Sequence, residues 1–470
     1  MNFPLLAVGL PFLGAVGLGV VGGPRVGAII NIAISIAGFV LTLAVWRGGQ
    51  VGPLAALFGV LSGFIGLTTA LANMRLVMLE ASDLSAGRWR GYHALFQLLL
   101  GLSLLGLYAD NIGLLWLALT GETMLTSWGL SLQRTPAALR AAWSYLLLGG
   151  VGMGLALFGT MLVYLAVQPV SGTWPRGMGF AALSAHAAQG DQSLLCLGFI
   201  LILFGYGAKA LLAPLNGWLA ARHAEGPMVL TYIVQGLFTN VALLAILRFR
   251  HVARIDSGPW LPDSIILAFA VASLFFAAFA MARQGNVRRF LGALASQQAA
   301  VTLFAFGIGG PMAIFGGLLQ MLVQTLLKSG SCLVLIRAVE GRGGDYTFAR
   351  LRGLPHFNKY LGWVFGAALF AWSGLPPSGL FVGEFIIIDQ TILHNPWMCV
   401  PLSIGLMLCA MPVLRYTGRV LCAPAPVEKT QKAGWDVNLA VLHLVVLLIL
   451  AFAMPALLVK LLTAAAGALQ

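Results

Sequence analysis

The chain has 470 residues, of which 60% are hydrophobic and only 9% are charged, and its mean hydropathy is +0.93. A soluble domain carries about 25% charged residues, so this composition excludes a water-soluble globular protein. The net charge of +13 is compatible either with nucleic-acid binding or with an uneven distribution of basic residues across a membrane.

Apolar runs of roughly twenty residues recur from one end of the chain to the other, and a membrane-spanning helix requires about that length. The runs are continuously apolar rather than alternating, which favours helices over a β-barrel. We therefore predict an all-α polytopic membrane protein. No basic residue precedes the first run, so we expect a transmembrane helix there rather than a signal peptide. The fourteen predicted spans are 3–21, 27–46, 54–80, 91–109, 111–131, 138–167, 193–215, 227–249, 262–282, 290–308, 312–337, 358–387, 397–415 and 437–463.

The basic residues between these spans are unevenly distributed. Nineteen Arg and Lys residues fall on one side of the fourteen-span arrangement, and six fall on the other. An excess of basic residues in the loops is typical of the cytoplasmic side of a membrane protein. The pattern predicts a multi-pass protein of a bacterial-type inner (cytoplasmic) membrane with both termini on the non-cytoplasmic side. It also accounts for the net charge without a nucleic-acid partner.

The remaining two basic residues, Lys209 and Lys328, lie in the middle of predicted spans. A lysine at the bilayer centre costs about 2.5–3.5 kcal/mol on insertion scales, unless it faces water or pairs with an acid. In the run "GYGAKALLAPLNGWLAARH", Pro214 and Asn216 follow Lys209 and predict a broken helix. Broken backbone in a membrane is tolerated only where protein or water satisfies it. We expect a hydrated cavity around Lys209; the alternative is a lysine that extends to the membrane surface.

Two of the fourteen carboxylates are equally deep. Glu122 lies in "LALTGETMLTSW", and Glu384 follows Pro376 and Pro377 in "GLPPSGLFVGEF". The chain therefore has two broken helices with nearby ionisable residues, one in each half, which is typical of transporters built from inverted repeats. Because buried lysine and glutamate change their protonation state readily, this pattern predicts a proton path.

Polar residues that do not titrate accompany these charges. Gln298 lies in the tenth predicted span, and Gln320 and Gln324 lie in the eleventh, where they share a helix face with Lys328. These amides are suited to hold ordered water along a path, or alternatively to join neighbouring helices by hydrogen bonds. His223 lies in a basic loop and is either part of the hydrated path or a surface residue.

The stretch "GYGAKALLAPLNGWLAARHAEGP" resembles the segment that carries the central lysine in the antiporter-like, proton-translocating membrane subunits of respiratory complex I and membrane-bound hydrogenases. "DNIGLLWLAL" at 110–119, "NVALLAILRF" at 240–249, "FARLRGLP" at 348–355 and "GLPPSGLFVGEF" at 374–385 follow in the order of that family. Within it, the chain is most similar to hydrogenase-4 component F, and the resemblance covers roughly 50–460.

The resemblance implies fourteen helices, two inverted five-helix repeats and broken seventh and twelfth helices. The chain 1–470 is then a single membrane domain, with helices 1–3 in 1–90, the first repeat in 91–249, the second in 262–415 and a last helix at 437–463.

The resemblance also implies functional roles. Lys209 matches the lysine of the seventh helix, Lys328 that of the eleventh and Glu384 the ionisable residue of the twelfth, which together form a proton path along the membrane midplane. A glutamate–lysine pair is expected in the first half. An ungapped alignment places the family's glutamate at Thr120, while Glu122 lies about 200° around an α-helix from that position. We therefore expect Glu122 to reach Lys209 only if its helix is locally distorted.

The leading hypothesis is a proton-translocating subunit of a redox-driven complex, either hydrogenase-4 or NADH dehydrogenase-like. Its partners are other membrane subunits and a cytoplasmic-side catalytic module. The sequence shows no quinone, flavin, haem or iron–sulfur motif, and its five cysteines lack metal-type spacing, so we expect no cofactor or metal and no redox chemistry in this chain. Three histidines of the family are replaced by Gln298, Gln320 and Gln324. A non-pumping scaffold or coupling subunit is therefore an alternative, and a proton-channel subunit of an energy-coupled inorganic-carbon uptake complex is another.

Overall fold

The computed structural model of the protein describes residues 2–80, 85–171, 176–213, 227, 230, 234–340, 345–424, 434 and 436–469. In this part of the chain, helices and short turns account for the fold and no β-strand forms. The helices of the first half are α1 (Phe3–Val21), α2 (Pro24–Gly48), α3 (Pro53–Glu80), α4 (Ala86–Tyr108), α5 (Ile112–Ser131), α6 (Pro136–Ser171), α7 (Phe180–His186), α8 (Gln192–Lys209) and, after a π-helical turn at Val234–Phe238, α11 (Thr239–Ser257). Those of the second half are α12 (Trp260–Ala282), α13 (Val287–Ile308), α14 (Pro311–Glu340), α15 (Leu354–Phe357), α16 (Lys359–Ala371), α17 (Gly379–His394), α18 (Cys399–Cys422), α19 (Asp436–Phe452) and α20 (Ala456–Ala468).

Local sequence explains where many of these helices begin. The first residue of α2, α3, α6 and α14 is a proline, whose fixed φ suits the first helical position, where no N–H partner is needed. The side chain of Asn111 accepts hydrogen bonds from the first N–H groups of α5, and Asn286 does the same for α13. These caps satisfy backbone N–H groups that have no partner within the helix.

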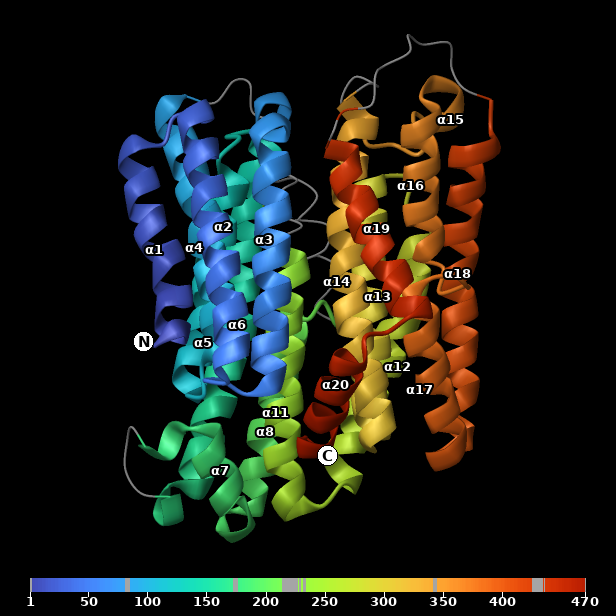
Figure 1. The fold of residues 1–470 in the computed structure, drawn as a ribbon. Coiled ribbons are helices and arrows are strands. Elements are labelled where there is room, and N and C mark those ends of the chain that lie inside the picture. The colour runs from blue at the N-terminus through green and yellow to red at the C-terminus, as the bar shows by residue number, and fades with distance from the viewer. Residues whose placement is uncertain are drawn as a thin grey trace.

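The helices form two neighbouring bundles that run in nearly the same direction (Figure 1). The first bundle contains α1 to α8 and α11, and the second contains α12 to α20. The long helix α14 is the centre of the second bundle, because it packs on α13, α16, α17, α19 and α20 and also contacts α3 of the first. Every residue in its apolar window is buried.

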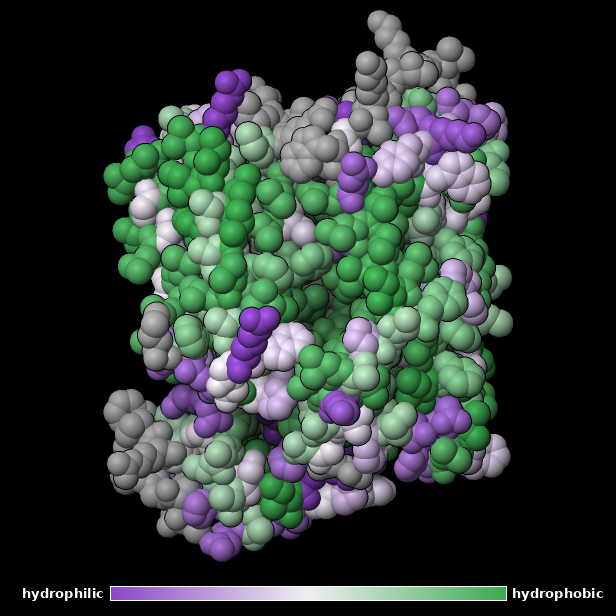
Figure 2. Space-filling model, viewed as in Figure 1, coloured by the Kyte–Doolittle hydropathy of each residue, from purple (hydrophilic) through white to green (hydrophobic). Residues whose placement is uncertain are grey.

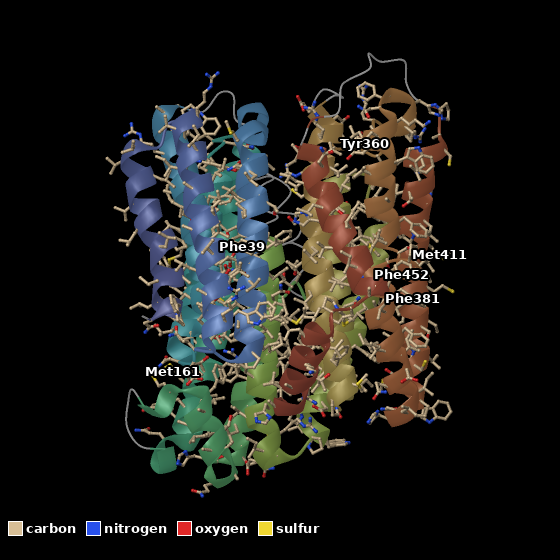
Figure 3. The ribbon with its side chains drawn as sticks, in the orientation of Figure 1. Phe39, Met161, Tyr360, Phe381, Met411 and Phe452 are labelled. Carbon is tan, nitrogen blue, oxygen red and sulfur yellow. The ribbon has the colours of Figure 1, made fainter. Side chains whose placement is uncertain are left out.

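The outer helices have the opposite character. In α1 and α18, only 22% of the apolar window is buried. Large apolar side chains are exposed on several outer helices, for example Met161 of α6, Met411 of α18 and Phe452 of α19 (Figure 3). Figure 2 shows a broad hydrophobic band on the visible face, with hydrophilic side chains gathered towards its upper and lower ends. Exposed apolar surface of this extent fits lipid or neighbouring membrane subunits and does not fit water.

Eleven helices in the described ranges are long and apolar enough to cross a membrane, and the bent pair α19 and α20 raises the number to twelve. Helix α5 falls outside this set because Glu122 and its neighbouring hydroxyl residues lower its hydropathy. Helices α16 and α17 fall outside it because they are short, with 13 and 16 residues.

One predicted span differs in shape. We expected a single helix over 437–463, but the structure has two helices, α19 and α20, which meet at an angle of 74°. Pro455 lies at the junction, where its ring and missing N–H prevent an uninterrupted helix. Another predicted connection, 168–192, contains the short helix α7.

Glycines allow α6 and α8 to approach each other closely. A Cβ atom on Gly205 of α8 would lie 2.6 Å from the backbone nitrogen of Ala156, and one on Gly159 of α6 would lie 2.6 Å from the carbonyl oxygen of Gly198. Small residues at a helix crossing are a common way to pack membrane helices. This crossing fixes the position of Lys209 at the end of α8.

We expect Gly205→Val to separate α8 from α6 and to lower the free energy of unfolding by about 1–3 kcal/mol, as overpacking does. Thermal unfolding of the detergent-solubilised protein, followed by intrinsic fluorescence, measures the change. Gly154→Val is the control, because nothing lies within 4 Å of a Cβ at Gly154 on the same α6 helix. Equal losses in both variants would contradict the close-packing account.

Candidate functional site

The deepest charges of the first half meet in an ion pair. Lys209 is the last residue of α8, and its Nζ donates a hydrogen bond to Oε2 of Glu122 on α5. The two side chains are only 3% and 1% exposed. Pairing and hydrogen bonding offset the cost of removing both charges from water. The predicted glutamate–lysine pair is therefore present.

The other oxygen of Glu122 accepts two hydroxyl hydrogen bonds. Tyr145 of α6 donates to Oε1 at 2.7 Å, and Thr126 donates to the same atom at 2.8 Å. Lys209 also donates to the Tyr145 hydroxyl at 3.3 Å, and its Nζ lies 5.0 Å from the centre of that ring. Sequence reasoning missed both hydroxyl residues. The available signal was a tyrosine inside an apolar span, whose buried O–H needs a partner.

The expected distortion of the fifth helix is wrong. Helix α5 is α-helical from Ile112 to Ser131, and Glu122 reaches Lys209 directly. The lysine ends its own helix and has a long, flexible stem, so it approaches the face of α5 that carries Glu122. The hydroxyl of Thr120, where the alignment placed the acid, is buried and has no hydrogen bond in the described ranges.

The seventh helix breaks immediately after Lys209, earlier than the position of Pro214. Leu211 has a φ of +63°, a conformation that costs about 1–2 kcal/mol for a residue with a Cβ. Two hydroxyls from the second half hold this turn: Ser296 donates to the carbonyl of Leu211 at 2.7 Å, and Ser273 accepts from the N–H of Ala213 at 2.9 Å. Pro214 and His223, both predicted as site residues, lie outside the described residues.

The predicted break at Pro376 and Pro377 separates α16 from α17. Ser378 caps α17 by accepting from the N–H of Phe381. In the break, the indole N–H of Trp372 donates to Ser331 of α14 at 2.9 Å. Gly374 has a φ of +68°, and a Cβ there would lie 2.2 Å from Oε2 of Glu384. Glycine is therefore required both for the turn and for space beside the carboxylate.

Glu384 lies in the second turn of α17, and amides surround it. Gln298 of α13 and Gln320 of α14 each direct an Nε2 towards its Oε1, at 3.5 and 3.4 Å. The amide nitrogen of Gln320 also donates to Oε1 of Gln298 at 2.5 Å. The structure thus brings together three of the predicted residues. The two glutamines make long hydrogen bonds to the buried carboxylate of Glu384.

Gln324 and Lys328 continue this line along α14. Each lies one turn beyond the previous residue, so Lys328 is about 12 Å along the helix from Gln320. Gln324 is fully buried, and neither atom of its amide has a hydrogen bond in the described part of the chain. The side-chain oxygens of Gln297 and Gln320 are also buried and accept no hydrogen bond in the described part of the chain. Buried polar atoms without protein partners usually bind ordered water.

A second polar contact joins the two halves beside this line. Asn240 of α11 donates from Nδ2 to the hydroxyl of Thr325 on α14 at 2.8 Å. Thr325 is the residue after Gln324, so this contact lies at the same depth as the unsatisfied amide. Sequence reasoning did not single out Asn240 or Thr325, because one asparagine and one threonine in apolar spans carry no distinctive pattern.

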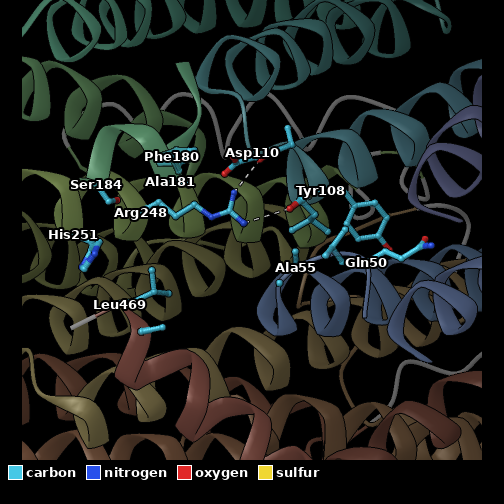
Figure 4. A pocket seen from close by; sticks show the side chains of 15 residues that line it. Gln50, Ala55, Tyr108, Asp110, Phe180, Ala181, Ser184, Arg248, His251 and Leu469 are labelled. Carbon is cyan, nitrogen blue, oxygen red and sulfur yellow. Dashed lines mark hydrogen bonds between the residues drawn. The ribbon is translucent and has the colours of Figure 1, made fainter. Parts of the chain in front are cut away.

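A cavity of about 450 Å³ lies elsewhere, at the end of the bundle where α4 and α20 finish (Figure 4). Tyr108, Asp110, Arg248 and His251 are among its lining residues. Arg248 donates to the carbonyl of Ala109 at 3.2 Å and so satisfies the end of α4. The cavity contains none of the predicted site residues. Among the described residues, no group of three or more His, Cys, Asp or Glu side chains is placed to hold a metal ion.

We expect Lys209→Met to lower the free energy of unfolding by about 3–5 kcal/mol, because it leaves a buried carboxylate without its opposite charge. The double variant Glu122→Gln/Lys209→Met should lose much less, because it removes both charges. A double-mutant cycle on thermal or detergent-induced unfolding measures the coupling. Additive losses would show that the two side chains do not form an ion pair.

The chain has relatives among known proteins. The family model described as NADH:quinone oxidoreductase/Mrp antiporter, TM, matches residues 109–411. The chain is 36% identical to the hydrogenase-4 component F homolog of Methylacidiphilum infernorum, over 84% of this chain and 85% of that protein. It is 27% identical to NADH-quinone oxidoreductase subunit N 2 of Roseiflexus castenholzii, over 71% and 69%.

Solved structures share the fold. A chain of the membrane-bound sulfane sulfur reductase, an archaeal respiratory membrane complex, superposes with a TM-score of 0.88 at 20% identity, over 100% of this chain and 98% of that one. A chain of the Mrp complex from Dietzia sp. DQ12-45-1b gives 0.84 at 19% identity, over 99% and 97%. A chain of respiratory complex I from Thermus thermophilus gives 0.80 at 19% identity, over 98% and 99%. With a family match over more than half of its length, this polytopic membrane chain belongs to the NADH:quinone oxidoreductase/Mrp antiporter family and is an antiporter-like membrane subunit.

Proposed function

We propose that this antiporter-like subunit translocates protons, and that Glu122, Lys209, Lys328 and Glu384 carry them. The observation that bears most weight is the buried ion pair of Lys209 and Glu122 at a helix break. A charge inside a membrane span is costly and is usually retained for function. The break exposes backbone groups that need water or protein, and such a site is suited to accept and release a proton.

The second half supplies the continuation of the path. Lys328, Gln324, Gln320 and Glu384 form one line from α14 to α17, with Gln298 beside the carboxylate. The unsatisfied amide of Gln324 lies between the two titratable ends of this line. Water bound there would connect Lys328 to the amides around Glu384, since water both donates and accepts hydrogen bonds. Glutamines therefore support a proton path by holding water, without titrating themselves.

The proposed architecture is fourteen transmembrane helices with two inverted five-helix repeats. The described helices supply up to twelve spans when α19 and α20 count as one. Helix α5 would be a thirteenth span, and α16 with α17 would form the fourteenth as one broken span. The two breaks support related halves: each contains a residue with positive φ, Leu211 in one and Gly374 in the other. Each also lies beside a buried ionisable side chain, Lys209 or Glu384.

The proposed setting is a redox-driven complex in a bacterial-type inner membrane, of the hydrogenase-4 or NADH dehydrogenase type. The names of the relatives support it, since they are a hydrogenase-4 component and an NADH-quinone oxidoreductase subunit. Other membrane subunits would cover the exposed apolar helices, and a cytoplasmic-side module would supply the energy. Mass spectrometry of the complex purified in mild detergent tests this; recovery of the chain without any hydrogenase or dehydrogenase subunit would contradict it.

We expect Lys209→Ala and Glu384→Gln to reduce proton transport by the purified complex in sealed vesicles by about tenfold or more, which corresponds to roughly 1.4 kcal/mol at the barrier. Each removes a titratable group from the line. A pH-sensitive dye inside the vesicles measures the rate.

The chain offers matched controls for this experiment. Lys460→Ala removes an exposed lysine, and Asp389→Asn removes an exposed carboxylate from the same helix as Glu384. Both should transport at the wild-type rate. Wild-type transport by Lys209→Ala and Glu384→Gln, in a complex that assembles normally, would exclude the proposed path.

We further propose that both termini lie on the non-cytoplasmic side, because most basic residues then lie in the cytoplasm. Alkaline phosphatase fused after Gln470 should be active in cells, while green fluorescent protein at the same place should be dark. The reverse result would invert the whole arrangement.

A non-pumping coupling subunit is the second candidate. The observation that favours it is the neutral set of Gln298, Gln320 and Gln324 around Glu384, where no amide can take up a proton. In that case the transport variants above would assemble with unchanged energetics, and the ion pair of Lys209 and Glu122 would serve only to fasten α5 to α8.

A further inference from the structure

Two hydroxyl groups converge on one oxygen of Glu122. Thr126 donates to Oε1 from one turn along α5, and Tyr145 donates to the same atom from α6. Both side chains are buried, at 5% and 1% exposure. The Glu122 carboxylate therefore has three donors fixed around it. One oxygen accepts two hydroxyl hydrogen bonds, and the other accepts from Lys209.

Tyr145 also touches the lysine. Its hydroxyl oxygen accepts from Nζ of Lys209 at 3.3 Å while its proton points to Glu122 at 2.7 Å. The phenol therefore bridges the ion pair through a route separate from the direct contact with Oε2. Glu122 and Tyr145 lie inside continuous helices, whereas Lys209 ends α8 beside a strained turn. The bridge joins two fixed groups to one at a helix end.

Thr126 shares the Oε1 atom with Tyr145 and also borders a space outside the ion pair. It lines a small void of about 10 Å³ together with Leu99 of α4, Gly129 of α5 and residues Pro227 and Leu230. This volume is at the lower limit for one water molecule, and Thr126 is the polar side chain among the described residues that line the void. Thr126 is one turn beyond Glu122 towards the end of α5 at Ser131, next to the predicted basic, cytoplasmic side. The void lies on that side of the ion pair.

We propose that Thr126 and Tyr145 form a hydroxyl relay, in which Thr126 passes protons between the void and Glu122 and Tyr145 passes them between Glu122 and Lys209. This inference rests on the proposed proton translocation.

The Tyr145 step balances without any further reactant. The Lys209 ammonium gives a proton to the phenol oxygen while the phenol gives its own proton to Oε1, so lysine becomes an amine, glutamate becomes an acid and tyrosine is unchanged. In the Thr126 step, a hydronium ion in the void gives a proton to the Thr126 hydroxyl while that hydroxyl gives its own proton to Oε1, so the carboxylate becomes an acid, the hydronium becomes water and threonine is unchanged. Both steps run in either direction.

The test uses the complete complex in sealed vesicles and measures the rate of proton transport. We expect Tyr145→Phe and Thr126→Val to slow transport by about tenfold, because each removes one donor from the relay. Thr126→Ser keeps the hydroxyl and should restore most of the rate, which a role in packing alone would not produce.

Two control variants remove comparable hydroxyls outside the relay. Tyr206→Phe deletes a buried phenol hydroxyl that makes no hydrogen bond in the described ranges. Thr123→Val deletes a buried threonine hydroxyl on α5 that donates to the carbonyl of Leu119 on its own helix. Both should transport normally. Complex assembly and thermal unfolding are measured for every variant. If a slow variant also fails to assemble, the comparison between Thr126→Ser and Thr126→Val decides the result.

The outcomes separate the relay from the proposed function. Wild-type rates in Tyr145→Phe and Thr126→Val, together with loss of transport in Lys209→Ala, would overturn the relay and leave proton translocation standing. Wild-type rates in all three would overturn both. Equal rates of Thr126→Ser and Thr126→Val would remove Thr126 from the relay.

Discussion

The cost of burying charge in an apolar environment is the constraint on which the rest of this structure depends. Lys209 and Glu122 remain inside the bundle because each supplies the opposite charge to the other and because Tyr145 and Thr126 complete the hydrogen bonding. The arrangement demands that α8 stop at Lys209, that α6 and α8 cross closely and that a phenol project from α6. Helix ends, glycines and hydroxyls in the first half are thus positioned around one pair of charges.

The second half handles its carboxylate differently. Glu384 is surrounded by amides instead of a cation in hydrogen-bonding contact, and Gly374 leaves the space that its oxygens occupy. Amides stabilise a carboxylate less than a cation does, but they also accept from its protonated form. The first half therefore places an opposite charge against its carboxylate, whereas the second surrounds its carboxylate with amides that can hydrogen-bond either protonation state.

Much of this could be predicted from the sequence, because membrane spans and deep charges are local signals. Most of the apolar helices and the break at Pro376 and Pro377 were expected, whereas contact between Glu122 and Lys209 was expected only with a distorted α5. Pro455 was an available signal for the bend between α19 and α20. Tyr145, Thr126 and Ser296 were missed, since a hydroxyl in an apolar helix is common and its partner is set only by tertiary packing. The prediction of a distorted α5 was wrong because an alignment gives the register of residues along one helix. It does not give the side from which the Lys209 side chain approaches that helix.

The bond between Ser296 and the carbonyl of Leu211 has a consequence for how such subunits can be recombined. Ser296 belongs to α13, two residues before Gln298, yet it holds the strained turn that ends α8. The two halves are therefore not independent modules, even if they arose by duplication. A chimera that takes residues up to Ser257 from this chain and the remainder from a relative would inherit a broken helix without its support, unless the relative also presents hydroxyls at the positions of Ser296 and Ser273. Exchange of whole halves between subunits is thus restricted by two hydroxyl groups.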